Sequence, residues 1–124
     1  MNDGSGVFTL VDGGNLTNSE SWSRDVVVGD FDGDGNLDVY EACGSHYTAM
    51  MNQYKSNYLN RLFMNDGNMG FVSAVGGDAT LFEKDTTGLT VGDFDGDGLL
   101  DVGVGAYGAS SYQGQISLFF NDNF

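Results

Sequence analysis

Short apolar stretches with strand-like patterning recur along the chain and predict an all-β fold. Residues 37–43 alternate between two faces, and residues 26–28 are three consecutive valines. Polar segments rich in glycine separate these stretches, as is typical of tight turns. The predicted strands are 7–11, 25–31, 37–43 and 58–64, followed by 71–75, 88–94, 100–106 and 115–120. A helix is an open alternative only between residues 44 and 58.

The same order of elements occurs twice, with a shift of 63 residues. The shift aligns Asn-Asp-Gly at 2–4 with Asn-Asp-Gly at 65–67, and Phe8 with Phe71. Internal repeats at such a spacing indicate solenoids, propellers or arrays. Four short antiparallel strands per repeat describe the blade of a β-propeller. We assign the first repeat to residues 1–63, the second to 64–119 and the start of a third to 120–124.

The most specific signal is a nine-residue acidic segment between the first and second strands of each repeat. Each copy has aspartate at positions 1, 3, 5 and 9, and glycine at positions 4 and 6. Two carboxylates about 4 Å apart repel by roughly 4 kcal/mol at an effective dielectric of 20. A hard cation reverses that repulsion, and oxygen ligands at alternate positions suit Ca²⁺. The predicted ligands of two Ca²⁺ ions are Asp30, Asp32, Asp34, Asn36 and Asp38, and Asp93, Asp95, Asp97, Leu99 and Asp101, with Leu99 ligating through its carbonyl oxygen.

An EF-hand is the main rival interpretation of the first acidic segment. Residues 30–41 fit the 12-residue EF-hand loop, with Glu41 at the last position. The second copy has Val104 at that position. The flanks are rich in valine and glycine, which are poor helix formers. The sequence therefore favours strands on both sides of each loop over the two helices of an EF-hand.

Residues 91–106, which read VGDFDGDGLLDVGVGA, resemble an FG-GAP repeat. Such repeats are the calcium-binding blades of integrin α-subunit propellers and of proteins with related VCBS repeats. The family has Gly-Ala-Pro where this chain has Gly105-Ala106-Tyr107. The resemblance implies a β-propeller in which Ca²⁺ stabilises the turn between the first two strands of each blade. It also implies an extracellular or cell-surface adhesion or recognition module without catalytic activity.

Composition and charge exclude several classes of partner. The formal net charge is −14, with only four Lys and Arg residues, so a nucleic-acid partner is not expected. No apolar run is long enough to span a membrane. Cys43 is the only cysteine, so no disulfide framework is expected. Its counterpart in the second repeat is Ala106, which predicts a small buried strand residue.

Successive strand connections of a propeller alternate between its two faces, and this alternation separates the metal loops from a candidate ligand face. The acidic loops and the Asn-Asp-Gly turns share one face, and the longer connections lie on the other. The connection at 44–57 is seven residues longer than its counterpart and carries aromatic and methionine residues. Its candidate ligand-binding residues are Tyr47, Tyr54 and Lys55, with packing against a neighbouring blade as the alternative. Asn15 begins a glycosylation sequon on the same face, and His46 is expected to be a surface residue.

The sequence predicts a calcium-stabilised extracellular module that binds a protein or glycan ligand. The alternatives are a structural building block of an extracellular filament or surface assembly, and a glycan-active enzyme on a propeller scaffold. A glycosidase needs two carboxylates about 5–10 Å apart in one pocket. The acids outside the metal loops are scattered without repeated pairing, so an enzyme is not favoured.

The repeats also predict packing and partners. Phe31 and Phe94 each lie between two ligand aspartates and are expected to point away from the ion, into the packing between blades. Residues 1–11 correspond to the outermost strand of one blade, and residues 88–120 to the three inner strands of another. We therefore expect further blades, either from the same longer chain or from other copies in a head-to-tail assembly.

Overall fold

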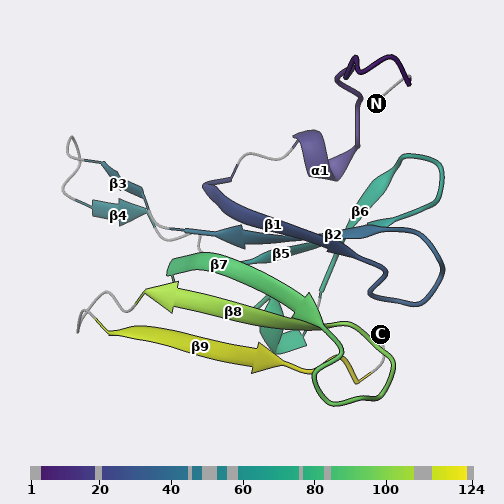
Figure 1. Cartoon of the computed structure of the whole chain (residues 1–124). Coiled ribbons are helices and arrows are strands. Elements are labelled where there is room, and N and C mark those ends of the chain that lie inside the picture. Colours follow the sequence, from purple (N-terminus) through teal and green to yellow (C-terminus); the bar gives the residue numbers. More distant parts are fainter. Residues whose placement is uncertain are drawn as a thin grey trace.

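The computed structural model describes residues 4–18, 21–44, 46–48, 53–55, 59–75, 77–82, 85–107 and 113–122. Short strands joined by loops dominate the structure (Figure 1). Its elements are α1 (Asn15–Asn18), β1 (Ser23–Gly29), β2 (Asp38–Cys43), β3 (His46–Thr48), β4 (Gln53–Lys55), β5 (Arg61–Asn65), β6 (Phe71–Ala74), a 3₁₀ turn η1 (Gly77–Ala79), β7 (Asp85–Gly92), β8 (Asp101–Tyr107) and β9 (Gly114–Phe119). The helices of this described part are all too short to cross a membrane.

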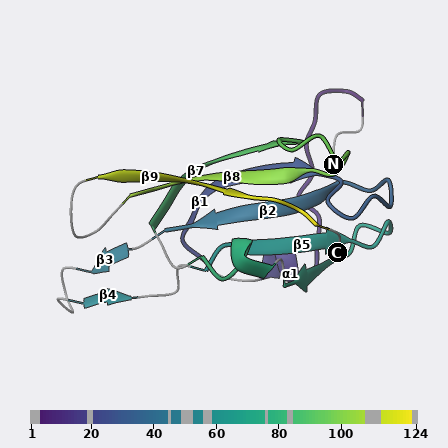
Figure 2. The same ribbon diagram turned by 90° about the horizontal axis from the view of Figure 1, so that it is seen from below.

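The strands form two main antiparallel sheets. The first sheet has the order β1-β2-β5-β6 and the second has the order β7-β8-β9. The two sheets lie next to each other, and β1 of the first contacts β7 of the second (Figures 1 and 2). The predicted all-β fold with antiparallel sheets is confirmed. Within the described residues the two sheets do not close into a ring.

Seven of the predicted strands are present, with small shifts at their ends. The three consecutive valines lie in β1, where β-branched side chains fit the pleated surface. Every residue of β2 is buried, because this strand is central in its sheet, between β1 and β5. In the second repeat β7, β8 and β9 are neighbours in chain order, as β1, β2 and β5 are in the first sheet.

The strand predicted at residues 7–11 is wrong. These residues lie outside any strand, and Phe8 and Leu10 are 80% and 94% exposed. A segment with β propensity becomes a strand only when a neighbouring strand offers its backbone groups and a face to pack on. Here Phe8 is in an isolated β-bridge, and residues 7–11 form no continuous strand.

The alternative of a helix between residues 44 and 58 is also wrong for the described part of this segment. This connection instead contains a two-stranded antiparallel hairpin, β3–β4, in which Tyr47 pairs with Tyr54. The hairpin projects beyond the sheets, at the end opposite to the β1–β2 loop (Figure 1). The residues added to this connection in the first repeat therefore extend a hairpin.

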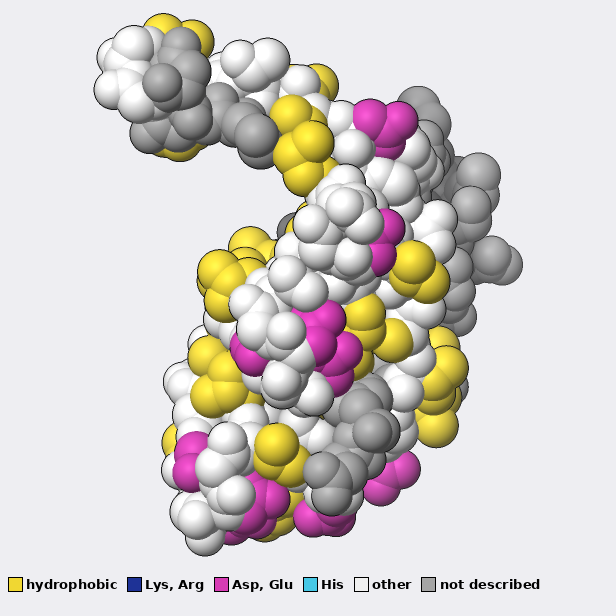
Figure 3. Space-filling model, turned by 90° about the vertical axis from the view of Figure 1, so that its right-hand side faces the viewer, with side chains coloured by type: hydrophobic (Ala, Val, Ile, Leu, Met, Phe, Trp, Pro, Cys, Tyr) yellow, Lys and Arg dark blue, Asp and Glu magenta, His cyan; other side chains and the backbone are white. Residues whose placement is uncertain are grey.

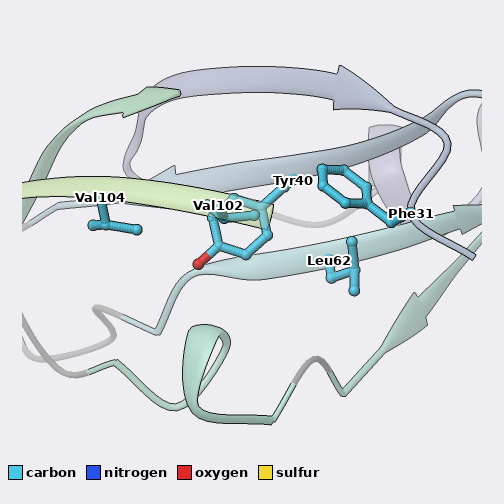
Figure 4. Packing of buried hydrophobic residues seen from close by; sticks show 5 residues of the cluster. All are labelled: Phe31, Tyr40, Leu62, Val102 and Val104. Carbon is cyan, nitrogen blue, oxygen red and sulfur yellow. The ribbon is translucent and has the colours of Figure 1, made fainter. Parts of the chain in front are cut away.

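The hydrophobic core lies between the two sheets. Phe31, Tyr40 and Leu62 come from the first repeat, and Val102 and Val104 come from β8 of the second (Figure 4). The Tyr40 hydroxyl donates to the carbonyl oxygen of Ala79 in η1, 2.5 Å away. Burial raises the pKa of Tyr40 to about 12, so the hydroxyl stays protonated and keeps this bond. The core therefore joins the two repeats into one packed unit.

The two phenylalanines of the acidic segments differ in burial. Phe31 is 3% exposed, which confirms its predicted role as a core anchor. Phe94 is 46% exposed, so the prediction that it is also a core anchor is wrong for this structure. The reason lies in the order of the sheets: Phe31 faces the second sheet, whereas no third sheet follows Phe94 among the described residues.

An ion pair between a buried carboxylate and a partly buried arginine spans β2 and β5 in the first sheet. Glu41 faces Arg61 across the strands, and its Oε2 accepts from Arg61 Nη2 at 2.5 Å and from Nε at 2.7 Å. The other carboxylate oxygen accepts from the hydroxyls of Ser21 and Ser23. Glu41 is thus a structural residue of β2, and does not complete an EF-hand loop. The second repeat has Val104 opposite Ser117 at the same register position.

We expect Arg61→Ser to lower the free energy of unfolding by about 3–5 kcal/mol, because it leaves the buried Glu41 carboxylate without its charge partner. The double variant Glu41→Val/Arg61→Ser copies the pair of the second repeat, and should recover part of that loss. Urea denaturation of the unmodified chain and of the two variants measures these differences in the free energy of unfolding. A double variant less stable than Arg61→Ser would contradict this account.

Candidate metal centres

The two acidic loops have the same backbone geometry. Asp30 Oδ1 accepts from the N–H of Gly33 at 2.7 Å, and Oδ2 accepts from Gly35 at 2.9 Å. Asp93 makes the corresponding bonds in the second loop, at 2.7 and 3.0 Å. Gly33 and Gly35 have φ of 78° and 90°, a region that glycine adopts without steric cost. The repeated glycines therefore permit the tight turn that the sequence predicted.

The last aspartate of each segment is completely buried and anchors its loop. Asp38 and Asp101 are both 0% exposed. Asp38 Oδ2 accepts from the N–H of Phe31 and Oδ1 accepts from Asn65, both at 2.9 Å. Asp101 accepts from Phe94 at 2.7 Å and from Asn121 at 2.8 Å. Each buried carboxylate thus ties the start of its loop to the end of a more distant strand.

Three carboxylates converge in each loop. The first group is Asp30, Asp32 and Asp38, and each offers a ligand oxygen within 4.8 Å of the others. The second group is Asp93, Asp95 and Asp101, with the same limit. Two oxygens bound to one Ca²⁺ at 2.3–2.6 Å are at most about 5 Å apart. Both groups therefore satisfy the spacing that a Ca²⁺ ion requires, and both offer only oxygen.

The other predicted ligands lie in the same loops but outside these two groups. Asp34 Oδ1 accepts from the N–H of Asn36 and Oδ2 from its side-chain amide, both at 2.8 Å. In the second loop Asp97 Oδ1 accepts from the N–H of Leu99 at 2.8 Å. Coordination by Asp34 would require its side chain to exchange these bonds for the ion. The metal role of positions 5 and 7 stays a prediction.

Electrostatics in both loops favours a bound cation. The hydrogen bond from the Asp34 backbone lowers the pKa of Asp32, but desolvation and the neighbouring carboxylates outweigh it and raise that pKa. Desolvation likewise raises the pKa of Asp95, and the carboxylates around it add to the shift. Neither described arginine lies within ion-pair distance of these loops. Acidic side chains gather on this end of the molecule, where the view shows no Lys or Arg among the described residues (Figure 3).

Sequence reasoning missed the role of two asparagines. The Asn65 side-chain amide donates to the carbonyl oxygen of Leu37 at 3.1 Å, and Asn121 donates likewise to Leu100 at 3.3 Å. Together with the backbone bonds to the buried aspartates, these contacts hold each loop at both ends. The sequence pattern that indicates this role is Asn-Asp after the last strand of each repeat. It was interpreted only as a turn.

The remaining candidate residues lie away from the acidic loops. Tyr47 lies in β3, and Tyr54 and Lys55 lie in β4; the arrangement of their side chains falls outside the described residues. Asn15 is exposed at the start of α1, which contacts β6. Cys43 is 1% exposed, as predicted for a buried strand residue, and desolvation raises the pKa of its thiol. His46 lies in β3.

Comparison with known families concerns the second repeat. The family model of the FG-GAP repeat matches residues 86–119, which contain β7, the second acidic loop, β8 and β9. This part of the chain is similar to an FG-GAP repeat. The predicted resemblance is thereby confirmed for this part of the chain. FG-GAP repeats belong to β-propeller-type modules and are typical of extracellular and cell-surface proteins. No curated protein and no solved structure matches the chain.

Proposed function

We propose that this chain is a calcium-stabilised, non-enzymatic β-propeller module of an extracellular protein, and that each acidic loop holds one Ca²⁺ ion. The observation that carries the proposal is the duplicated site. Two loops 63 residues apart make the same backbone bonds, and each brings three carboxylates within 4.8 Å of one another. A solvated acidic turn needs no such convergence, whereas an oxygen-ligated cation does.

Burial adds a second argument for the ion. A buried carboxylate is costly unless its charge is compensated. Asp38 and Asp101 receive two backbone N–H bonds each, but no positive side chain of the described residues pairs with them. A Ca²⁺ ion supplies the missing positive charge beside each buried carboxylate. This is where the loop meets its flanking strands and the asparagine that bonds to the carboxylate. The ion would therefore stabilise the sheet as well as the loop.

Calcium titration of the whole chain by calorimetry tests the proposal, with two bound ions as the expected stoichiometry. Asp32→Ala and Asp95→Ala should each remove one site and leave the other, because each lies in only one group. Asp34→Ala tests whether position 5 joins the first ion. Asp78→Asn removes one negative charge outside both loops and serves as the matched control. Full binding by the Asp32→Ala/Asp95→Ala double variant would overturn the proposal.

We further propose that the module recognises a protein or glycan ligand through the β3–β4 hairpin. The hairpin projects from the sheets at the end opposite to the β1–β2 loop, and a projecting element on a rigid scaffold is a common site of recognition (Figure 1). Tyr47, Tyr54 and Lys55 lie on its two strands. A glycan array probed with the chain and with the triple alanine variant tests this role. Equal signals from both would contradict it.

A structural role in an extracellular assembly is the second candidate function. The observation that favours it is the exposure of large apolar residues in the two acidic segments, including Leu37 and Phe94. In either function the module works alongside further blades, which come from the same longer chain or from other copies.

A further inference from the structure

The two acidic loops differ at position 7, which is Asn36 in the first loop and Leu99 in the second. Both residues donate their backbone N–H to the aspartate two positions earlier, at 2.8 Å in each loop. Such a bond is the usual local turn of an aspartate side chain. The backbone at position 7 is therefore the same in both loops, and the difference lies in the side chain.

The Asn36 side chain makes a bond that has no equivalent in the second loop. Its Nδ2 donates to Asp34 Oδ2 at 2.8 Å, so both carboxylate oxygens of Asp34 accept from Asn36. Leucine has no side-chain donor. In the second loop Asp97 Oδ1 accepts from the Leu99 backbone, and no described residue donates to Asp97 Oδ2. Asp34 is thus held at both oxygens, whereas Asp97 is held at one.

The Asn36 amide is held in place by the turn between β5 and β6. The first acidic loop and this turn lie side by side at one end of the first sheet (Figures 1 and 2). A methyl group at Gly67 would lie 3.4 Å from both Asn36 Oδ1 and Nδ2, so the glycine backbone lies against the amide. Asn36 is half-buried, although Asp34 and Gly35 before it are exposed. The bond to Asp34 is therefore made by a side chain whose rotation is restricted.

This bond opposes the recruitment of Asp34 to an ion. Neither Asp34 nor Asp97 belongs to the converging carboxylate groups, so each must turn toward the centre of its loop before it can ligate. The turn of Asp34 breaks its bond with the Asn36 amide, whereas Asp97 has no corresponding bond to break. Loss of one hydrogen bond to a charged group changes an equilibrium constant by about tenfold or more.

We propose that Asn36 is a positioning residue that holds Asp34 away from the first ion, and that the first loop is therefore the weaker of two calcium sites. The inference rests on the proposed calcium function and deepens it, because it assigns an order of filling. As the Ca²⁺ concentration rises, the second loop fills first. The first loop, taken by itself, fills at a concentration about ten times higher.

Chains with a single working site measure each loop without influence from the other. Asp95→Ala leaves the first site, and Asp32→Ala leaves the second, because each aspartate belongs to one group only. Calcium titration of both chains by calorimetry should give a Kd about tenfold higher for the first loop. Circular dichroism spectra of the two chains verify that both are folded.

Exchange of the residues at position 7 tests the cause of the difference. In the Asp95→Ala chain, Asn36→Leu removes the amide and should lower the Kd of the first loop about tenfold. In the Asp32→Ala chain, Leu99→Asn supplies an amide and should raise the Kd of the second loop. Asn68→Leu is the matched control for the first exchange, because it makes the same chemical change at an exposed residue outside the loop. It should leave the Kd unchanged.

A double-mutant cycle separates the proposed bond from a general change in the loop. If Asn36 acts through Asp34, the gain from Asn36→Leu disappears once Asp34→Ala is present. Conversely, Asp34→Ala should cost more calcium affinity in the Asn36→Leu chain than in the chain that keeps Asn36, because only the released carboxylate ligates readily. A merely structural role of Asn36 would give the same gain with and without Asp34.

The outcomes separate this inference from the proposed calcium function. Equal Kd values for the two single-site chains, or tighter binding by the first loop, would overturn the inference and leave both calcium sites standing. An unchanged Kd in the Asn36→Leu chain, or a gain that persists with Asp34→Ala, would do the same. If neither single-site chain binds Ca²⁺, the proposed function and the inference fail together.

Discussion

Removal of calcium is expected to lower the thermal midpoint of the chain sharply. At a free Ca²⁺ concentration 100 times the dissociation constant, one site adds about 2.7 kcal/mol to the free energy of unfolding. Two sites would then contribute about 5 kcal/mol, against a total stability of about 5–15 kcal/mol for a typical domain. The chelated protein also regains the repulsion among the carboxylates of each loop.

Circular dichroism melting curves in excess Ca²⁺ and in excess chelator measure this effect. Mg²⁺ is the informative control ion, because it is smaller and requires near-octahedral geometry at shorter distances. We expect Mg²⁺ to restore less of the midpoint than Ca²⁺ does. Identical melting curves with Ca²⁺ and with chelator would show that neither loop is stabilised by a bound ion.

Phe31→Ala is expected to lower the free energy of unfolding by about 3–5 kcal/mol, through lost burial and the cavity left between the sheets. Phe94→Ala is the matched control, since it makes the same change at the corresponding position of the other loop. In dilute chains it should cost about 1 kcal/mol or less, because the Phe94 ring is about half exposed.

Urea denaturation in saturating Ca²⁺, followed by the fluorescence of the single tryptophan, measures both phenylalanine variants. The calcium ligands are unchanged, so a difference between the two variants reports packing. Equal losses would mean that the second sheet packs as tightly around Phe94 as the two sheets pack around Phe31.

Local sequence patterns predicted most of the strands and both acidic loops. The reason is that these features depend on short-range chemistry: β-branched runs, glycines with positive φ, and carboxylates at alternate positions. In the structure β6 belongs to the first sheet, although the Asn-Asp-Gly turn before it opens the second repeat. Two copies of one pattern constrain the fold more tightly than either copy alone.

The predictions that failed depend on neighbours that a local pattern cannot supply. Residues 7–11 have the composition of a strand, but a strand needs a continuous ladder to a neighbour, and in this segment only Phe8 is in a β-bridge. Phe94 occupies the same position in its loop as Phe31, but no further sheet covers it. The Glu41–Arg61 pair was missed because its two residues lie on different strands, so their contact depends on the register of β2 and β5.

The bonds of Asn121 have a consequence for the way the loops respond to calcium. One amide donates to the carbonyl oxygen of Phe31, within the first acidic segment, and to that of Leu100, within the second. An ion that orders either loop thereby fixes an acceptor of the shared amide and lowers the cost of ordering the other loop. If both loops bind Ca²⁺ as proposed, each ion would therefore raise the affinity of the other by the same factor.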